Sequence, residues 1–274
     1  MISSPYAKWE PGTDRTSLLI TFAAMAGTST APTFAFGQVA GELQCSKLFF
    51  VDPNEIIYQR GIPGVGSDFW EVAEAIKELQ KREGVQRTTL IGNSSGGFAA
   101  LVTGAIIGNC TVHAFNPPTF LTSPTHTHNK LLCRRMAGAN PRNKRTLNLS
   151  AFLKEESVRN TESYVYYSRG EAIDRKRSVL LKGVPGLRVI PYNLLGHELA
   201  RYMAKEGTIS ELLRASFNGN ENNIETMVRK SRRKANLRMT PIFTEWWMKK
   251  IRRRIDSIRG LRNIKRHASM EPIS

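Results

Sequence analysis

Three residues of this chain, Ser94, Asp174 and His197, could together perform nucleophilic chemistry. Ser94 stands between two glycines in the pattern Gly92-x-Ser94-x-Gly96. A serine hydroxyl is a poor nucleophile at neutral pH, and it needs an adjacent base that a third group orients. Histidine and a carboxylate can fill those two roles, and with serine they allow attack on a carbonyl carbon.

The stretch around Ser94 predicts a strand, a tight turn and a helix. Residues 88–91 form a short apolar run that indicates a buried strand, and residues 97–107 indicate a helix of small residues. The flanking glycines are needed where the two backbones crowd together, because glycine has no Cβ. The serine hydroxyl is then exposed at the tip of the turn, and the Ser95 amide can donate to a developing oxyanion.

This segment resembles the nucleophile elbow of the α/β-hydrolase superfamily, whose members place serine, acid and histidine in that chain order. The resemblance covers about residues 16–216. It implies that Ser94 is the nucleophile, His197 the general base and Asp174 the group that orients the imidazole. The acid follows a predicted strand at 163–168 and the histidine follows the last predicted strand, at 187–192. An aspartate at that point could also be a helix N-cap, and a Gly-His loop could be structural.

Two parts of the predicted site remain open in the sequence. Glu171 shares the loop with Asp174 and could meet the imidazole instead, although the resemblance favours aspartate there. The second oxyanion donor should lie after the first strand, where the superfamily often has His-Gly. Here the chain has Ala23-Ala24-Met25, so the backbone amide of Met25, or failing that Ala24, is the expected donor.

Strand and helix patterns alternate through the body of the chain. Strands are predicted at 17–22, 45–51, 88–91, 110–115, 163–168 and 187–192. Helices are predicted between a cap at Ser67 or Asp68 and a stop at Gly84, at 97–107, at 175–181 and after His197. This alternation predicts an α/β fold with a mostly parallel sheet and helices on both faces. Ligands of such sheets bind beyond the carboxyl ends of the strands, where Ser94 and Asn116-Pro117 would lie.

The ends and the insertion depart from this alternation. Residues 1–16 are polar and contain Pro and Gly, and Trp9 and Tyr6 are predicted to cover the sheet edge. The resemblance lacks the superfamily's two usual leading strands, so we expect a sheet trimmed at one edge. Residues 119–160 form an insertion of the kind that makes a lid in the superfamily, and residues 26–41 form a loop in which Phe34 and Phe36 could line a pocket. We therefore predict a hydrolase-type domain at 1–216 and a separate tail at 217–274.

The net charge of +17 is concentrated in the tail. Residues 228–274 hold 15 Lys and Arg against 3 Asp and Glu, a net of +12, whereas residues 1–227 hold 25 against 20. Two basic helices are predicted, at 222–235 and 243–258. They could pack on the body, lie on an anionic membrane surface through residues 229–266, or hold nucleic acid phosphates. No zinc finger, RNP motif or helix-turn-helix accompanies the charge, so nucleic acid is less favoured.

Other patterns limit the compartment and the cofactors. The three cysteines form no C-x-x-C pair, which argues for a reducing compartment and against a disulfide framework or zinc site. Residues 17–27 follow charged residues and read as a core strand rather than a signal peptide. We expect a cytoplasmic protein, with the inner membrane surface as an alternative position if the tail binds lipid.

No cofactor and no metal are expected. His126 and His128 have no nearby cysteine or carboxylate, so they read as solvated loop residues. The glycine-rich loop at 61–67 lacks the lysine of a phosphate-binding loop.

These patterns predict a serine hydrolase that works through an acyl-enzyme, and the resemblance to α/β-hydrolases implies a small-molecule ester or thioester as its substrate. An acyltransferase would use the same residues. A non-catalytic accessory protein of polysaccharide or lipid assembly is the alternative from another class, because a fold does not fix a function.

Overall fold

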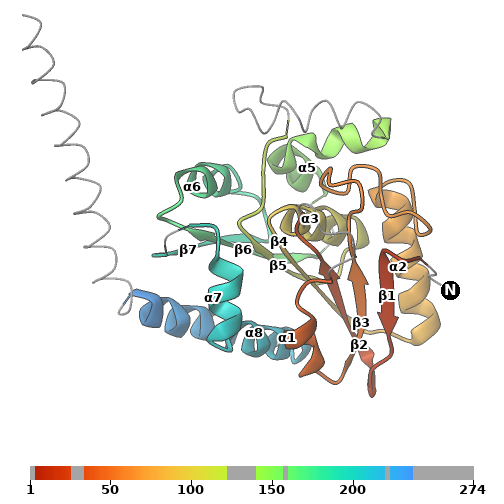
Figure 1. Cartoon of the computed structure of the whole chain (residues 1–274), viewed down its shortest axis with the longest axis horizontal. Helices are drawn as coiled ribbons and strands as arrows, with labels where there is room; N and C mark the ends of the chain where they lie inside the picture. Colours follow the sequence, from red (N-terminus) through yellow and green to blue (C-terminus); the bar gives the residue numbers. More distant parts are fainter. Residues whose placement is uncertain are drawn as a thin grey trace, which may run out of the picture.

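The computed structural model of the chain describes residues 4–25, 34–121, 140–156, 160–194, 196–219 and 223–236. In this part of the chain one sheet of seven strands forms the centre of the molecule, with the order β1-β3-β2-β4-β5-β6-β7 (Figure 1). The strands are β1 (Ala7–Glu10), β2 (Asp14–Phe22), β3 (Cys45–Phe50), β4 (Arg87–Asn93), β5 (Thr111–Phe115), β6 (Glu162–Ser168) and β7 (Leu187–Tyr192). Only the β1–β3 pair is antiparallel among them, so the predicted mostly parallel sheet is confirmed.

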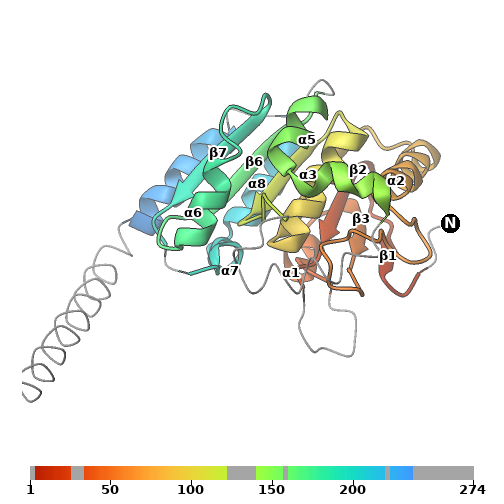
Figure 2. The same ribbon diagram turned by 90° about the horizontal axis from the view of Figure 1, so that it is seen from above.

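Helices cover both faces of this sheet, as the alternation predicted (Figure 2). The elements are α1 (Gly37–Gly41), α2 (Phe69–Glu83), α3 (Ser95–Ile107), η2 (Pro141–Leu147), α5 (Leu149–Glu156), α6 (Ala172–Val179), α7 (Leu199–Lys205) and α8 (Thr208–Phe217), followed by a helix at 223–236. Helices α2, α3 and α5 enclose one core with the sheet, and α1, α7, α8 and the 223–236 helix enclose the other. No helix in the described part is both long and apolar enough to cross a membrane.

Helix α2 illustrates how the sequence sets the boundaries. The Asp68 side chain accepts a hydrogen bond from Glu71 N at 2.8 Å and so caps the helix start. Gly84 ends it with φ 71°, a left-handed conformation that suits glycine. The apolar residues between them face the sheet, and the predicted helix is confirmed.

Two predictions at the start of the chain are wrong in detail. Residues 7–10 form the edge strand β1, which was not predicted, with Ala7 buried in the core; Tyr6 and Trp9 pack on the core at this edge, as predicted. One leading antiparallel strand is therefore present. Residues 37–41, predicted as loop, form α1, whose buried Val39 and Ala40 join the second core.

The second half of the predicted insertion belongs to the packed body. Asn143 is fully buried and donates to the Gln59 carbonyl at 2.8 Å, and Gln59 Nε2 donates to Thr146 Oγ1 at 3.2 Å. The Arg142 guanidinium lies 4.5 Å from the centre of the Trp70 ring. These contacts fix η2 to the loop before α2. Residues 122–139 of the predicted lid, with His126 and His128, lie outside the described residues.

The first predicted tail helix is confirmed at 223–236 and packs on the body. Its buried positions are Ile224, Val228, Ser231 and Ala235, which recur at helical spacing. This matches the interpretation in which the tail packs its apolar side on the body. The second predicted tail helix, at 243–258, lies outside the described residues.

Candidate active site

Ser94 occupies a strained turn between β4 and α3. Its φ of 52° and ψ of −119° lie in a region that a residue with a side chain rarely adopts. A Cβ on Gly92 would lie 2.1 Å from the Gly96 carbonyl oxygen, and a Cβ on Gly96 would lie 2.1 Å from the Phe22 carbonyl oxygen. Both positions therefore exclude any side chain, which is the physical reason for the glycines of the motif.

The turn leaves Ser94 partly accessible at the head of a buried helix. The Ser94 N–H donates to the Phe115 carbonyl at 2.8 Å, which ties the turn to the end of β5. Every residue of α3 from Ser95 to Ile106 is buried, so the helix cannot shift without disturbing the core. The Ser95 amide lies at the helix N-terminus, where partial positive charge favours an anion.

His197 and Asp174 form a hydrogen bond at the same edge of the sheet. His197 Nδ1 lies 2.8 Å from Asp174 Oδ2. The aspartate side chain is 2% exposed and the histidine side chain 40% exposed. An ionised carboxylate only accepts hydrogen bonds, so Nδ1 carries the proton and Nε2 of a neutral imidazole keeps its lone pair. His197, the more exposed partner, thus has a basic nitrogen, Nε2, that can accept a proton.

The pair changes the acid–base behaviour of the imidazole. The hydrogen bond from His197 to Asp174 raises the pKa of the histidine, and partial burial and the nearby Arg177 guanidinium oppose this. Burial lowers the pKa of Arg177 in turn, against the attraction of Asp174.

The structure distinguishes the two carboxylates that the sequence left open. Glu171 is the N-cap of α6, and its side chain accepts from Ile173 N at 3.3 Å. Asp174 lies in the first turn of α6, so the loop predicted through residue 174 is wrong: the helix begins at Ala172. The cap at Glu171 starts the helix early and aims Asp174 inward, and only Asp174 is hydrogen-bonded to His197.

Asn116 joins the ends of three elements beside Ser94. Its Oδ1 accepts from Ser168 N at 3.2 Å, and its Nδ2 donates to the His197 carbonyl at 3.2 Å. Asn116 is fully buried and has φ 46°, a conformation that asparagine tolerates. The sequence predicted that Asn116 lies at this edge but predicted no role for it. Its position at a strand end, just before two prolines, was the only sign in the sequence that it could be important. Because Phe115 holds Ser94 and Asn116 holds His197, consecutive residues anchor both.

The segment after β2 lies against the elbow. The Met25 N–H donates to Ser95 Oγ at 2.9 Å, and the Ser95 side chain is buried. The Tyr58 hydroxyl donates to the Ala23 carbonyl at 2.9 Å. In this structure the Met25 N–H is therefore engaged with Ser95 Oγ. The part of the 26–41 loop from 26 to 33 lies outside the described residues.

His113 is unsuited to the role of base, although it is also near the centre of the sheet. It is fully buried, and burial lowers its pKa to about 3. Its Nδ1 lies 2.9 Å from the Tyr166 hydroxyl and its Nε2 2.8 Å from Ser216 Oγ. Since Ser216 Oγ donates to the Leu212 carbonyl, it accepts from Nε2–H, and Tyr166 donates to Nδ1. His113 is therefore a neutral core residue.

The described cysteines and acids do not form a metal site. Burial raises the pKa of Cys45 to about 11 and of Cys110 to about 12, so both remain neutral thiols. In the part of the chain that the structure covers, no three His, Cys, Asp or Glu side chains gather to hold a metal ion.

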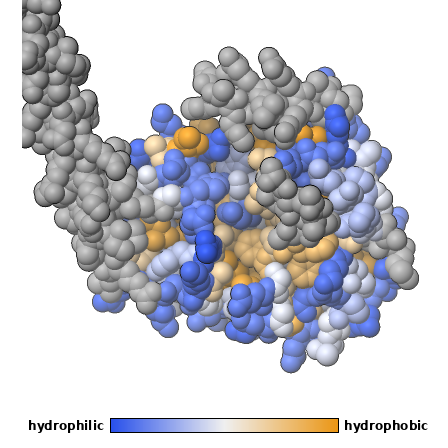
Figure 3. Space-filling view, viewed as in Figure 1, coloured by the Kyte–Doolittle hydropathy of each residue, from blue (hydrophilic) through white to orange (hydrophobic). Residues whose placement is uncertain are grey.

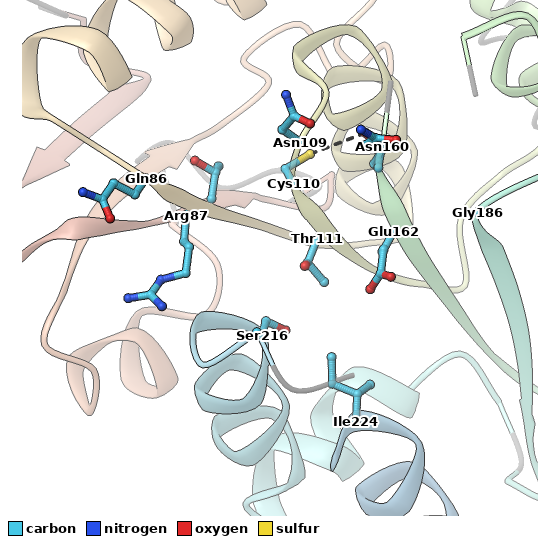
Figure 4. Close-up of a pocket in the computed structure, with 13 residues that line it drawn as sticks. Gln86, Arg87, Asn109, Cys110, Thr111, Asn160, Glu162, Gly186, Ser216 and Ile224 are labelled. Atoms are coloured by element: carbon cyan, nitrogen blue, oxygen red, sulfur yellow. Dashed lines mark hydrogen bonds between the residues drawn. The ribbon is translucent and has the colours of Figure 1, made fainter. Parts of the chain in front are cut away.

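The surface has two further features, and one of them lies at the opposite edge of the sheet from Ser94. Apolar side chains gather on the face seen in Figure 1, between α1 and α7 (Figure 3). A cavity of about 610 Å³ lies at the opposite edge of the sheet, at the starts of β4, β5 and β6. Arg87, Thr111 and Glu162 line it (Figure 4). Ser94 lies at the opposite end of β4 and does not line this cavity.

No family model matches the chain, and no curated protein matches its sequence. Solved structures do match its fold. The capsule O-acetyltransferase of Neisseria meningitidis serogroup A, in complex with CoA, is 18% identical with a TM-score of 0.55, and covers 74% of this chain and 90% of that chain. The monoacylglycerol lipase of Paleococcus ferrophilus is 15% identical with a TM-score of 0.50, and covers 77% and 98%.

A third match is the glycosylation associate protein complex of Streptococcus agalactiae. It is 14% identical with a TM-score of 0.52, and covers 76% of this chain and 44% of that chain. Together with the sheet order and the helices on both faces, these likenesses show an α/β-hydrolase-type fold.

Proposed function

We propose that this chain, with its α/β-hydrolase-type fold, is a serine hydrolase of carboxylic esters or thioesters. Ser94 is the nucleophile, His197 the general base and Asp174 the orienting acid. The observation that supports this most is the 2.8 Å bond between Asp174 and His197, at the sheet edge where Ser94 occupies a strained turn.

The mechanism follows from the hydrogen-bonding capacity of each group. His197 Nε2 accepts the Ser94 proton as Oγ attacks the carbonyl carbon, and Asp174 stabilises the imidazolium. The Ser95 amide holds the oxyanion together with one amide of the segment after β2, either Ala24 or a Met25 that has left its bond to Ser95 Oγ. The imidazolium then protonates the leaving group. Water attacks the acyl-enzyme with His197 again as base, and the imidazolium returns the proton to Ser94 Oγ as the Oγ–acyl bond breaks and the acid leaves. The Oγ–Nε2 contact needed for the first step can tighten when substrate binds.

A test of the proposal measures covalent labelling. A fluorophosphonate probe reacts with an activated serine, so the purified protein should be labelled at Ser94 and should hydrolyse p-nitrophenyl acetate. A protein that is folded by circular dichroism but neither labelled nor active would overturn the proposal.

Acyl transfer is the second candidate function, because an O-acetyltransferase in complex with CoA shares the fold. The same acyl-enzyme would then release its acyl group to an alcohol in place of water. Incubation with acetyl-CoA and a sugar acceptor separates the two outcomes. Acetylated sugar in excess over free acetate indicates transfer, and free acetate alone indicates hydrolysis.

An accessory role without catalysis is the rival from another class. The reason to consider this role is the fold likeness to a glycosylation associate protein complex. A non-catalytic protein has no need of strain at Ser94 or of a buried carboxylate against His197, and these features favour the enzyme.

The first prediction concerns pH. Asp174 raises the pKa of His197 above the usual value of about 6.5, and the base must be neutral to accept a proton. The kcat/KM for a neutral ester should therefore rise with pH and reach half its maximum above about 6.5. Stopped-flow or plate assays across the neutral range check this. A midpoint below the usual histidine value would contradict the assignment of His197 as base.

The second prediction concerns the Ser95 side chain. Ser95→Ala removes the acceptor of the Met25 N–H and so releases the segment that supplies the second oxyanion donor. We expect kcat to fall by about 10- to 100-fold with little change in KM, because the segment acts on the transition state. Steady-state kinetics check the split between kcat and KM. An unchanged kcat would show that the Met25–Ser95 bond has no part in the reaction.

A further inference from the structure

A groove of about 210 Å³ lies between β7 and the helix at 223–236, away from the proposed catalytic residues. Figures 1 and 2 show this helix beside the last strand of the sheet. Three arginines line the groove: Arg188 from β7, and Arg229 and Arg232 from the helix. The single carboxylate in the lining is Glu225.

The charges of the groove are not balanced. Arg188 forms an ion pair with Glu225, and its guanidinium carbon lies 5.7 Å from the centre of the Tyr164 ring. No ion pair of Arg229 or Arg232 occurs among the described residues. Arg232 is half-buried, so its charge is partly withdrawn from water. An anion in the groove would offset that cost.

The side of this helix that faces the solvent is basic. Its apolar and small side is buried against the body, as described above, and the exposed side carries Arg229, Lys230, Arg233 and Lys234. Because the apolar side is already used, this helix cannot insert into a bilayer by that side. It can bind an anionic surface only through its charge, and such binding weakens as salt screens it.

We propose that the groove and the exposed cations around it bind the phosphate headgroups of an anionic lipid bilayer. Arginine guanidinium groups suit phosphate because they offer paired N–H donors in a plane. A 210 Å³ groove has room for a phosphate group, and the exposed cations beside it meet neighbouring headgroups. This surface is independent of the proposed catalytic function.

The sequence that follows the helix favours lipid over nucleic acid. The chain continues from residue 237 with further Lys and Arg and the pair Trp246-Trp247. Tryptophan beside basic residues is typical of segments at the membrane interface. Clusters of Lys and Arg attract anionic lipid with about 1 kcal/mol for each residue near the surface.

The test compares flotation of the full-length protein with vesicles of phosphatidylcholine and with vesicles that also contain phosphatidylglycerol. The protein should float only with the anionic vesicles, and less at high salt. Arg229→Gln/Arg232→Gln should weaken this binding by roughly 30-fold. Lys77→Gln/Lys81→Gln on α2 removes the same charge elsewhere, and should change binding by less than about threefold.

Three outcomes would overturn the proposal. An equal loss in the two double variants would mean that total charge, and not the groove, governs binding. Unchanged binding of Arg229→Gln/Arg232→Gln would exclude the groove outright. Tighter binding to duplex DNA than to anionic vesicles in the same buffer would assign the surface to nucleic acid instead. Circular dichroism of each variant confirms that the fold is retained.

Discussion

Ser94→Ala is expected to lower kcat for an activated ester by about 10⁵- to 10⁶-fold and to abolish labelling by a fluorophosphonate. The turn at Ser94 leaves no other hydroxyl at its tip, because the neighbouring Ser95 side chain is buried and accepts from Met25 N. His197→Ala should have an effect of the same order, since residues that act as a unit give similar losses when removed singly. Gel fluorescence after labelling and hydrolysis of p-nitrophenyl acetate measure both.

Ser95→Ala is the matched control for Ser94→Ala, because it removes a hydroxyl one residue away. It should still be labelled, although more slowly. The assignment of Ser94 as nucleophile is wrong if Ser94→Ala is labelled as fast as the wild type. It is also wrong if Ser95→Ala is not labelled while Ser94→Ala is. Thermal unfolding of the variants separates loss of chemistry from loss of fold.

Asp174→Asn is expected to lower kcat by about 10⁴-fold with the structure intact. An amide at this position can donate to His197 Nδ1, and the proton would then move to Nε2, the nitrogen that must accept the Ser94 proton. The loss of the negative charge should also lower the pKa of His197 relative to the wild type, because the bond to Asp174 is the main cause of its rise. Kinetics of hydrolysis against pH measure both effects.

Glu171→Gln is the matched control for the acid. Glutamine can still accept from Ile173 N and cap α6, so catalysis should change by no more than a few fold. A loss as large as that of Asp174→Asn would make Glu171 the working acid. Full activity of Asp174→Asn would remove the orienting acid from the proposal.

The tight turn at Ser94 and the sheet were predictable from the sequence because short-range chemistry determines them. A Cβ on Gly92 or Gly96 would lie 2.1 Å from a backbone oxygen, so few residues other than glycine can occupy these positions. The strands after residue 44 are apolar runs with clear ends. Strand β1 was missed because it is four residues long and mixes exposed and buried positions at a sheet edge.

Contacts between residues that are distant in the sequence were harder to predict. The choice of Asp174 over Glu171 depends on where α6 begins, and the Glu171 cap moves that start by three residues from the prediction. The role of Asn116 depends on contacts with β6 and the His197 loop, across 52 and 81 residues of chain. The bond between Met25 N and Ser95 likewise joins residues 70 apart, and no periodicity reports it.

The buried amide of Asn116 has a consequence for how the site would fail on heating. One side chain spans β5, β6 and the loop of His197, so the backbone that carries His197 cannot move outward alone while that amide keeps both bonds. Separation of the loop would leave a buried N–H without an acceptor, which costs about 1–3 kcal/mol. Alignment of the base is therefore coupled to the integrity of the central sheet. Heat should inactivate this site together with the cooperative melting of the sheet, and not through earlier fraying of a surface loop.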